Sequence, residues 1–232
     1  MNRFPWLLTL LALPALALLI GLGVWQVQRM GWKEGMIARA EAAAGLAPVP
    51  LAEVMALHDP EFRKVIVDCA GLATAPFVEL QSIHDGQAVS RLISVCRPSD
   101  FPAAFLIDRG FVADTISARP PVRVEATPVR ITAELRETPT PGPMALAPDG
   151  DHFYARDTAA MARALGLADP DPHTLFALTS SNPDWLALKP SAPPAAFSNN
   201  HLGYVLTWFG LAIALVGFYV ALLRRRMQKD PN

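Results

Sequence analysis

Two long apolar runs frame the chain and dominate its pattern of hydrophobic and polar positions. From Phe4 to Val27, 24 consecutive residues carry no charge, and from Leu202 to Leu223 the same holds for 22 residues. At about 1.5 Å of rise per residue, a helix of either length crosses a hydrocarbon core of about 30 Å. The pattern therefore predicts two membrane-spanning helices.

A secretory signal peptide is the alternative interpretation of the first run, because Arg3 precedes an apolar stretch near the amino terminus. The run is longer than the apolar core of about 7 to 15 residues found in signal peptides, and no small-x-small cleavage pattern follows it. We therefore expect a retained span. The absence of an Arg- and Ser-rich leader favours a bacterial source.

The positions of the cations predict the orientation of the two spans. Arg224, Arg225 and Arg226 follow the second run, and such clusters remain on the cytoplasmic side of a membrane. Arg29, Lys33 and Arg39 argue for the reverse orientation, but they are more widely spaced. We expect a multi-pass protein of the bacterial inner membrane with both termini in the cytoplasm. The expected parts are a transmembrane helix at 4–27, a periplasmic domain at 28–201, a transmembrane helix at 202–223 and a basic cytoplasmic tail at 224–232.

The central segment is predicted to form one domain of short strands and helices. Residues 28–201 carry a net charge of −5 and hold 19 of the 22 prolines, and the segment is long enough to bury a core of its own. Strands are expected, from β-branched content and partial alternation, at 63–69, 90–95, 104–112 and 129–135. His84, Asp85 and Gly86 predict a hairpin turn between two apolar runs.

Helices and loops complete the expected fold. Asp157 as N-cap and Gly166 just past the end predict a helix over 158–165, and a second helix is expected to continue the first span over 28–44. Loops are expected at 139–148 and 190–194. The fold class predicted is α+β, with two transmembrane helices flanking a mainly antiparallel β periplasmic domain.

Aromatic and cationic residues gather where the first span is expected to leave the membrane. Trp25, Arg29 and Trp32 recur at i, i+4 and i+7, so they share one helix face, with Lys33 beside it and Gln26 next to Trp25. Tryptophan is enriched at membrane interfaces, and Arg and Lys anchor spans there. Membrane anchoring is therefore the simplest explanation for this cluster taken alone.

A second cluster begins the second span at the same expected depth. His201, Tyr204 and Trp208 recur at i, i+3 and i+7, again on one helix face. An ionisable residue at a span boundary is uncommon, and imidazole is a usual axial ligand of haem iron. A histidine that only hydrogen-bonds to Asn199 or Asn200 is the structural alternative.

Small residues occupy another face of the second span. Gly203, Gly210, Ala214, Gly217 and Ala221 lie roughly opposite His201. Small residues allow membrane helices to approach closely. We expect this face to pack on the first span or on a partner helix, which would leave the histidine face for a ligand or a client protein.

The combined motifs resemble the Surf-one (Surfeit locus protein 1) family. They comprise Trp25-Gln26-x-x-Arg29-x-x-Trp32-Lys33, then Arg109-Gly110 after an apolar strand, then Phe153-Tyr154 with the helix behind Asp157, and finally Asn199-Asn200-His201-Leu202-x-Tyr204 with Thr207-Trp208-Phe209. The resemblance covers the whole chain in order. Where the family pattern usually has Asn-Arg-Gly-Trp, this chain has Asp108-Arg109-Gly110-Phe111.

The resemblance implies an assembly factor for haem-copper cytochrome c oxidase that serves respiratory-chain biogenesis and is not an enzyme. It implies transient binding of haem a at the periplasmic end of the spans, with His201 as ligand of the iron. The implied partners are the catalytic subunit of the oxidase, haem a synthase and the lipid bilayer. A scaffold that binds no cofactor and docks an oxidase assembly intermediate is the alternative, and the sequence leaves open whether the client oxidase takes electrons from cytochrome c or from quinol.

The candidate residues can be given separate physical roles in binding haem a. Haem a is an apolar macrocycle with anionic propionates, so a carrier needs an apolar layer with cations at its rim. His201 would ligate iron, Trp25 and Trp208 would flank the ring, and Arg29 or Lys33 would pair with propionates. Gln26, Trp32 and Tyr204 complete the candidate cofactor-binding set.

Other chemistry has no support in the sequence. The chain contains no Walker-type phosphate loop, paired-histidine zinc motif or Gly-x-Ser-x-Gly elbow, and its net charge of −1 gives no footprint for nucleic acid. His58, His84, His152 and His173 are expected at the surface. Two cysteines, Cys69 and Cys96, lie in two expected strands and either form one disulfide or remain buried thiols.

Overall fold

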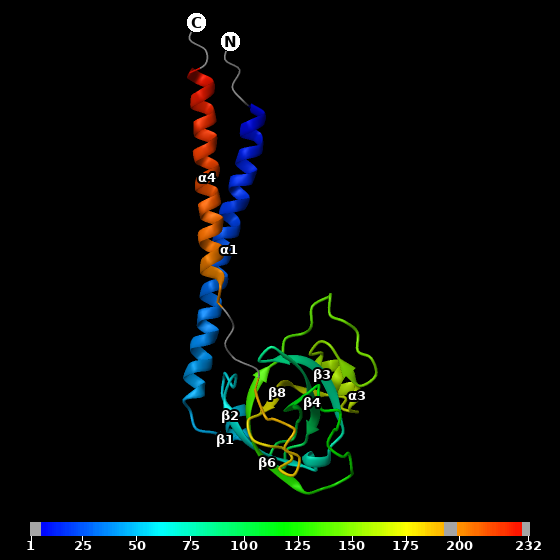
Figure 1. The fold of residues 1–232 in the computed structure, drawn as a ribbon. Helices are drawn as coiled ribbons and strands as arrows, with labels where there is room; N and C mark the ends of the chain where they lie inside the picture. Colours follow the sequence, from blue (N-terminus) through cyan, green and yellow to red (C-terminus); the bar gives the residue numbers. More distant parts are fainter. Residues whose placement is uncertain (1–5, 193–198, 229–232) are drawn as a thin grey trace. The chain divides into compact units, whose positions relative to one another are not determined.

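The computed structural model describes residues 6–192 and 199–228, and contacts divide the chain into two compact units. One unit, here called the helix pair, comprises Met1–Ala38 and Ala196–Asn232. The other, here called the β-domain, comprises Arg39–Ala195. Each unit is described by itself below (Figure 1).

The helices and strands follow in chain order. They are α1 (Trp6–Ala44), β1 (Val49–Pro50), α2 (Leu51–Met55), β2 (Lys64–Ala70), the 3₁₀ turn η1 (Leu72–Thr74), β3 (Phe77–His84), β4 (Gln87–Cys96), β5 (Ala104–Ala113), β6 (Pro128–Glu137), β7 (His152–Phe153), α3 (Thr158–Ala164), β8 (Pro170–Ala177) and α4 (His201–Gln228). The four expected strands correspond to β2, β4, β5 and β6, and the expected helix corresponds to α3.

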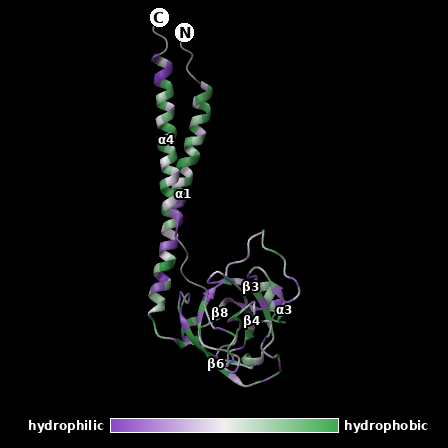
Figure 2. Cartoon of the chain, viewed as in Figure 1, coloured by the Kyte–Doolittle hydropathy of each residue, from purple (hydrophilic) through white to green (hydrophobic). Residues whose placement is uncertain are grey.

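Both spans appear as long apolar helices. By length and composition, α1 and the part of α4 from His201 to Arg226 are able to cross a membrane. Few of their apolar side chains are buried in the protein, and Figure 2 shows hydrophobic colour over the amino-terminal part of α1 and most of α4, with more hydrophilic colour over the rest of α1 and the end of α4. The first helix continues without a break to Ala44, as the sequence predicts.

Local sequence explains the turns that bound the smaller elements. The side chain of Asp157 accepts a hydrogen bond from the amide of Ala160 at 2.9 Å and so caps α3, while Gly166 adopts φ +71° just past its end. Asp85 and Gly86 both take positive φ between β3 and β4, which is the geometry of a tight hairpin turn.

One eight-stranded sheet forms the β-domain, in the order β1-β2-β6-β8-β5-β4-β3-β7. The expectation of a mainly antiparallel sheet is corrected in one respect, because the sheet is mixed. The β1–β2, β5–β8 and β3–β7 pairs are parallel, and the others are antiparallel. The parallel β5–β8 pair arises because β8 returns to the sheet after a long connection that includes α3 and inserts between β5 and β6.

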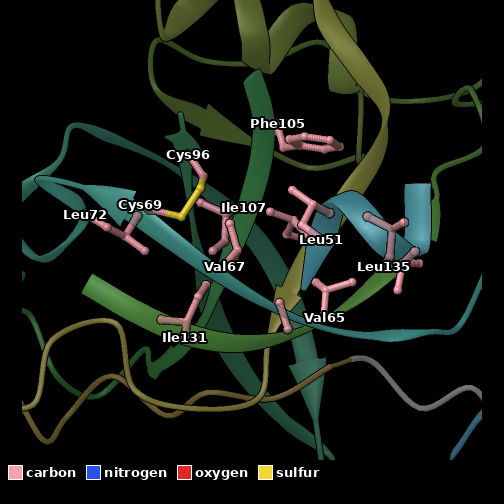
Figure 3. Close-up of a cluster of buried hydrophobic side chains, with 13 residues drawn as sticks. Leu51, Val65, Val67, Cys69, Leu72, Cys96, Phe105, Ile107, Ile131 and Leu135 are labelled. Carbon is pink, nitrogen blue, oxygen red and sulfur yellow. A yellow bond between two sulfur atoms is a disulfide. The ribbon is translucent and has the colours of Figure 1, made fainter. Parts of the chain in front are cut away.

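A disulfide in the main core joins two strands that are not neighbours in the sheet. Cys69 of β2 and Cys96 of β4 are both fully buried and bonded to each other, although β6, β8 and β5 lie between their strands in the sheet order. The sheet must therefore curl to bring them together. Figure 3 shows the disulfide among the buried side chains, with Leu51 of α2 in the same cluster.

Candidate functional site

The candidate site lies in the helix pair, where α1 and α4 run antiparallel. Thr9 Oγ1 and Tyr219 Oη lie 2.7 Å apart near one end, and His201 meets Gln26 near the other. Along both helices the less exposed positions recur at alternating spacings of three and four residues, as in helices that pack along a heptad seam. These positions include Ala12, Leu16, Leu19, Gly23, Gln26 and Met30 on α1, and His201, Val205, Trp208, Ala212, Leu215 and Tyr219 on α4.

The seam identifies which face of α4 meets α1, and it overturns one expectation. Among the described residues, no atom outside the backbone of α4 itself lies within 4 Å of the position that a Cβ on Gly203, Gly210 or Gly217 would occupy, so the small face does not pack on α1. The glycine at the contact is instead on α1: a Cβ on Gly23 would lie 2.8 Å from the ring of Phe209. Phe209 of α4 occupies that space and His201 bonds to Gln26, so the histidine face is the one that contacts α1.

A short hydrogen bond joins α1 and α4 at the depth where the sequence predicts the membrane interface. The candidate residues around this contact are called the layer below. Nδ1 of His201 and Oε1 of Gln26 lie 2.5 Å apart, and Gln26 is only 8% exposed. The sequence offered Asn199 as a partner for this histidine, but Asn199 points its Nδ2 at the carbonyl oxygen of Met30, at 3.5 Å. Both asparagine and histidine therefore reach across the seam to α1.

Three of the aromatic candidates on α1 and α4 have open surfaces. Trp25, Trp32 and Tyr204 are each about half exposed. The guanidinium of Arg29 lies 4.0 Å above the ring of Trp32, which is the geometry of a cation–π interaction. Lys33 is half-buried. Open aromatic faces next to cations are what a flat, apolar and anionic ligand requires.

Two buried polar atoms of the layer have no hydrogen-bond partner in the described part of the chain. They are the indole nitrogen of Trp208 and Oδ1 of Asn199. Burying such a group without a partner costs about 1–3 kcal/mol. Trp208 follows His201 by two helical turns, so the cost falls on the same face of α4 that carries the imidazole.

The β-domain holds a second polar cluster, which sequence reasoning missed. The carboxylate of Asp108 is fully buried, and its Oδ2 accepts from Arg91 at 2.7 Å and from Arg156 at 2.6 Å. Arg91 also donates to the carbonyl oxygen of Ser191. The cluster joins four segments of the chain, and its one sequence signal was the charged Asp108-Arg109 pair inside an apolar strand.

Arg109 donates hydrogen bonds to a different set of partners. It donates to Ser181 Oγ and to the carbonyl oxygen of Ala73, both at 2.9 Å, and Nη1 has no partner among the described residues. Burial lowers the pKa of its guanidinium to about 10, so it remains charged at neutral pH. Each of these hydrogen bonds joins Arg109 to another segment of the same chain. Their role is therefore to stabilise the fold.

Beside it, Gly110 provides close backbone approach. It has φ +110°, and a Cβ there would lie 2.0 Å from the carbonyl oxygen of Lys189. The amide of Phe111 and the carbonyl oxygen of Lys189 form one of two hydrogen bonds that fasten this segment to β5, at 2.9 Å. Glycine is therefore required at this position by geometry.

The cysteines and the other histidines do not gather into a metal centre. Among the described residues no group of three or more His, Cys, Asp or Glu side chains is placed to hold a metal ion. His58 and His152 are exposed, whereas His173 is half-buried and lies 2.8 Å from Asp171, and His84 stacks on Phe111 with ring centroids 4.1 Å apart.

Comparison with known proteins identifies the family. The sequence model of the SURF1 family matches residues 13–213. Surfeit locus protein 1 of Mus musculus is 32% identical over 88% of this chain and 71% of its own length. The chain belongs to the SURF1 family. Its members are known as cytochrome c oxidase assembly factors and are not known as catalytic enzymes.

Two further SURF1 relatives are also similar to this chain. Surfeit locus protein 1 of Homo sapiens is 28% identical over 90% of this chain and 74% of its own length. A SURF1-like protein of Rickettsia conorii is 58% identical over 36 residues, which is 16% of this chain and 15% of that protein. A bacterial protein thus shares a short stretch at much higher identity than the vertebrate proteins share over about nine-tenths of the chain.

Proposed function

We propose that this SURF1 family member assists assembly of haem-copper cytochrome c oxidase by holding haem a at the layer around His201 and passing it to the catalytic subunit. The observation that carries the proposal is the placement of His201. Its Nδ1 is bonded across the seam to Gln26, at 2.5 Å, beside half-exposed aromatic side chains.

The residues of the layer fit haem a as a cargo. An imidazole nitrogen is a usual axial ligand for haem iron, and the hydrogen bond of His201 to Gln26 uses Nδ1 and not Nε2. Trp25 offers an open ring for the macrocycle, and Arg29 is a cation suited to a propionate. A single protein ligand also favours release, because only one bond to iron has to be exchanged at the client.

The proposed setting is the bacterial inner membrane, with both termini in the cytoplasm and the β-domain in the periplasm. Arg224, Arg225 and Arg226 near the end of α4 support this orientation by the positive-inside rule. The disulfide between Cys69 and Cys96 supports it independently, because such bonds persist in oxidising compartments. Haem a synthase is a further proposed partner, as the source of the cargo.

A cofactor-free scaffold is the second candidate, and one observation favours it. The face of α4 that carries Gly203, Gly210 and Gly217 is not covered by α1. Small residues let a helix approach closely in a membrane, so a helix of an oxidase assembly intermediate would fit there. In this alternative the layer around His201 stabilises the helix pair and binds no haem.

The test is an absorption spectrum of protein purified in detergent from cells that make haem a. We expect a Soret band in the wild type, its loss in His201→Ala, and its retention in the control His152→Ala, which removes an exposed histidine of the β-domain. Equal haem content in the wild type and His201→Ala would refute the ligand assignment. No haem in the wild type, together with oxidase maturation that still depends on the protein, would favour the scaffold.

A further inference from the structure

The contact between His201 and Gln26 joins the first residue of α4 to a residue of α1 that lies 175 positions earlier. Gln26 is 8% exposed, so its amide is withdrawn into the seam and its oxygen faces the imidazole. A buried amide with this geometry acts on the histidine and is poorly placed to touch a large ligand itself.

The chemistry of the pair determines where the imidazole proton resides. An amide oxygen only accepts hydrogen bonds, so Nδ1 of His201 must donate to Oε1 of Gln26. A neutral imidazole carries one proton, and a proton on Nδ1 leaves the lone pair on Nε2. In water the Nε2–H tautomer is the more populated one. The hydrogen bond to Gln26 therefore selects the Nδ1–H tautomer.

We propose that Gln26 is a positioning residue: it holds His201 as the Nδ1–H tautomer and leaves Nε2 as the nitrogen that ligates haem iron. The inference rests on the proposed function. It also makes the ligand conditional on pairing of the two spans, because the group that prepares His201 belongs to the other helix. Asn199 strengthens the same junction through its contact with the carbonyl oxygen of Met30.

The choice of an amide suits a carrier that must release its cargo. A carboxylate at this position would accept the same proton more strongly and raise the basicity of Nε2, which tightens the bond to iron. Glutamine orients the ring without that increase. The hydrogen bond to Gln26 therefore prepares Nε2 of His201 as a ligand and leaves its bond to iron of moderate strength.

The first test needs no haem. We would record ¹⁵N NMR spectra of full-length, haem-free protein labelled at histidine in detergent, above the pH at which imidazole is protonated, and assign His201 by its absence in His201→Ala. The wild type should show a protonated Nδ1 and an unprotonated Nε2. Gln26→Met, of similar length but without an acceptor, should move the proton toward Nε2, while Gln26→Glu should keep it on Nδ1. Gln28→Met is the matched control at an exposed position of α1.

The second test measures haem affinity of the same variants. Loss of the hydrogen-bond partner of a metal ligand typically weakens metal binding by about 10- to 100-fold, so Gln26→Met should bind haem at least about 10-fold more weakly than Gln28→Met. Gln26→Glu should bind at least as tightly as the wild type and release haem more slowly.

The outcomes separate this inference from the function on which it rests. An Nε2–H tautomer in the wild type, or unchanged haem affinity in Gln26→Met, overturns the role of Gln26. If haem is then still lost in His201→Ala, the proposed function stands. If His201→Ala binds haem as well as the wild type, the ligand assignment fails and the inference fails with it, whatever the tautomer. If the wild type binds no haem, the proposed function itself fails.

Discussion

Replacing both Cys69 and Cys96 with alanine should lower the free energy of unfolding of the β-domain by about 3.5 kcal/mol. The bond spans a sequence separation of 27 residues. Closing a loop of that length removes conformational entropy from the unfolded chain, and the chain-entropy relation gives about 12 cal/mol/K, or about 3.5 kcal/mol at 25 °C. Both side chains are fully buried, so the loss of packing around two sulfur atoms adds to this figure.

The measurement is urea unfolding of the full-length protein in detergent, read by a short protease pulse that degrades only unfolded β-domain. With a urea m-value of about 2 kcal/mol/M, the predicted loss lowers the midpoint by roughly 1.7 M. Wild-type protein treated with reductant should shift by a similar amount, because it loses the same covalent constraint. A shift below about 0.5 M in both samples would refute the reasoning, since it would correspond to only about 1 kcal/mol.

Two further changes test the β-domain by the same assay. Gly110→Ala should destabilise it by about 3 kcal/mol or more, because positive φ is costly for alanine and the new Cβ would meet the carbonyl oxygen of Lys189; Gly142→Ala, at a position with no neighbour within 4 Å, is the control and should unfold like the wild type. Burial opposes ionisation of Glu79, but the hydrogen bonds from Arg119 prevail and lower its pKa below 4.5, so the stability it contributes is present above that value and is lost as pH falls through the lowered pKa. Glu79→Gln should remove this part of the acid dependence, and an unchanged pH profile would contradict the assignment.

The local elements of the fold were largely predictable because their signals are local. Asp157 and Gly166 bound α3, and Asp85 with Gly86 forms the turn between β3 and β4, as their side chains and permitted φ values require. The strand β8 escaped prediction. It begins at Pro170 and contains a second proline, which the pattern of a typical strand lacks, and it is placed by pairing with β5 and β6.

For the β-domain, the sequence left the cysteines with two alternatives, and only the curled sheet decided between them. Cys69 and Cys96 lie on strands that are separated by three others in the sheet order, so their contact depends on curvature that no local pattern encodes. The buried partners of Asp108 had the same origin. Arg91 and Arg156 donate to its carboxylate, and Ser191 accepts from Arg91, all from segments that only the tertiary structure brings together.

For the helix pair, the sequence by itself determined the length of each apolar run and which residues share a helix face, because a helix has a fixed rise and a fixed rotation per residue. It did not determine which face of α4 meets α1. That choice depends on how bulky side chains of one helix fit the space on the other, and Phe209 fits against Gly23. The tertiary structure therefore turned His201 toward Gln26 and left the glycines of α4 uncovered, since packing depends on the shapes of both helices together.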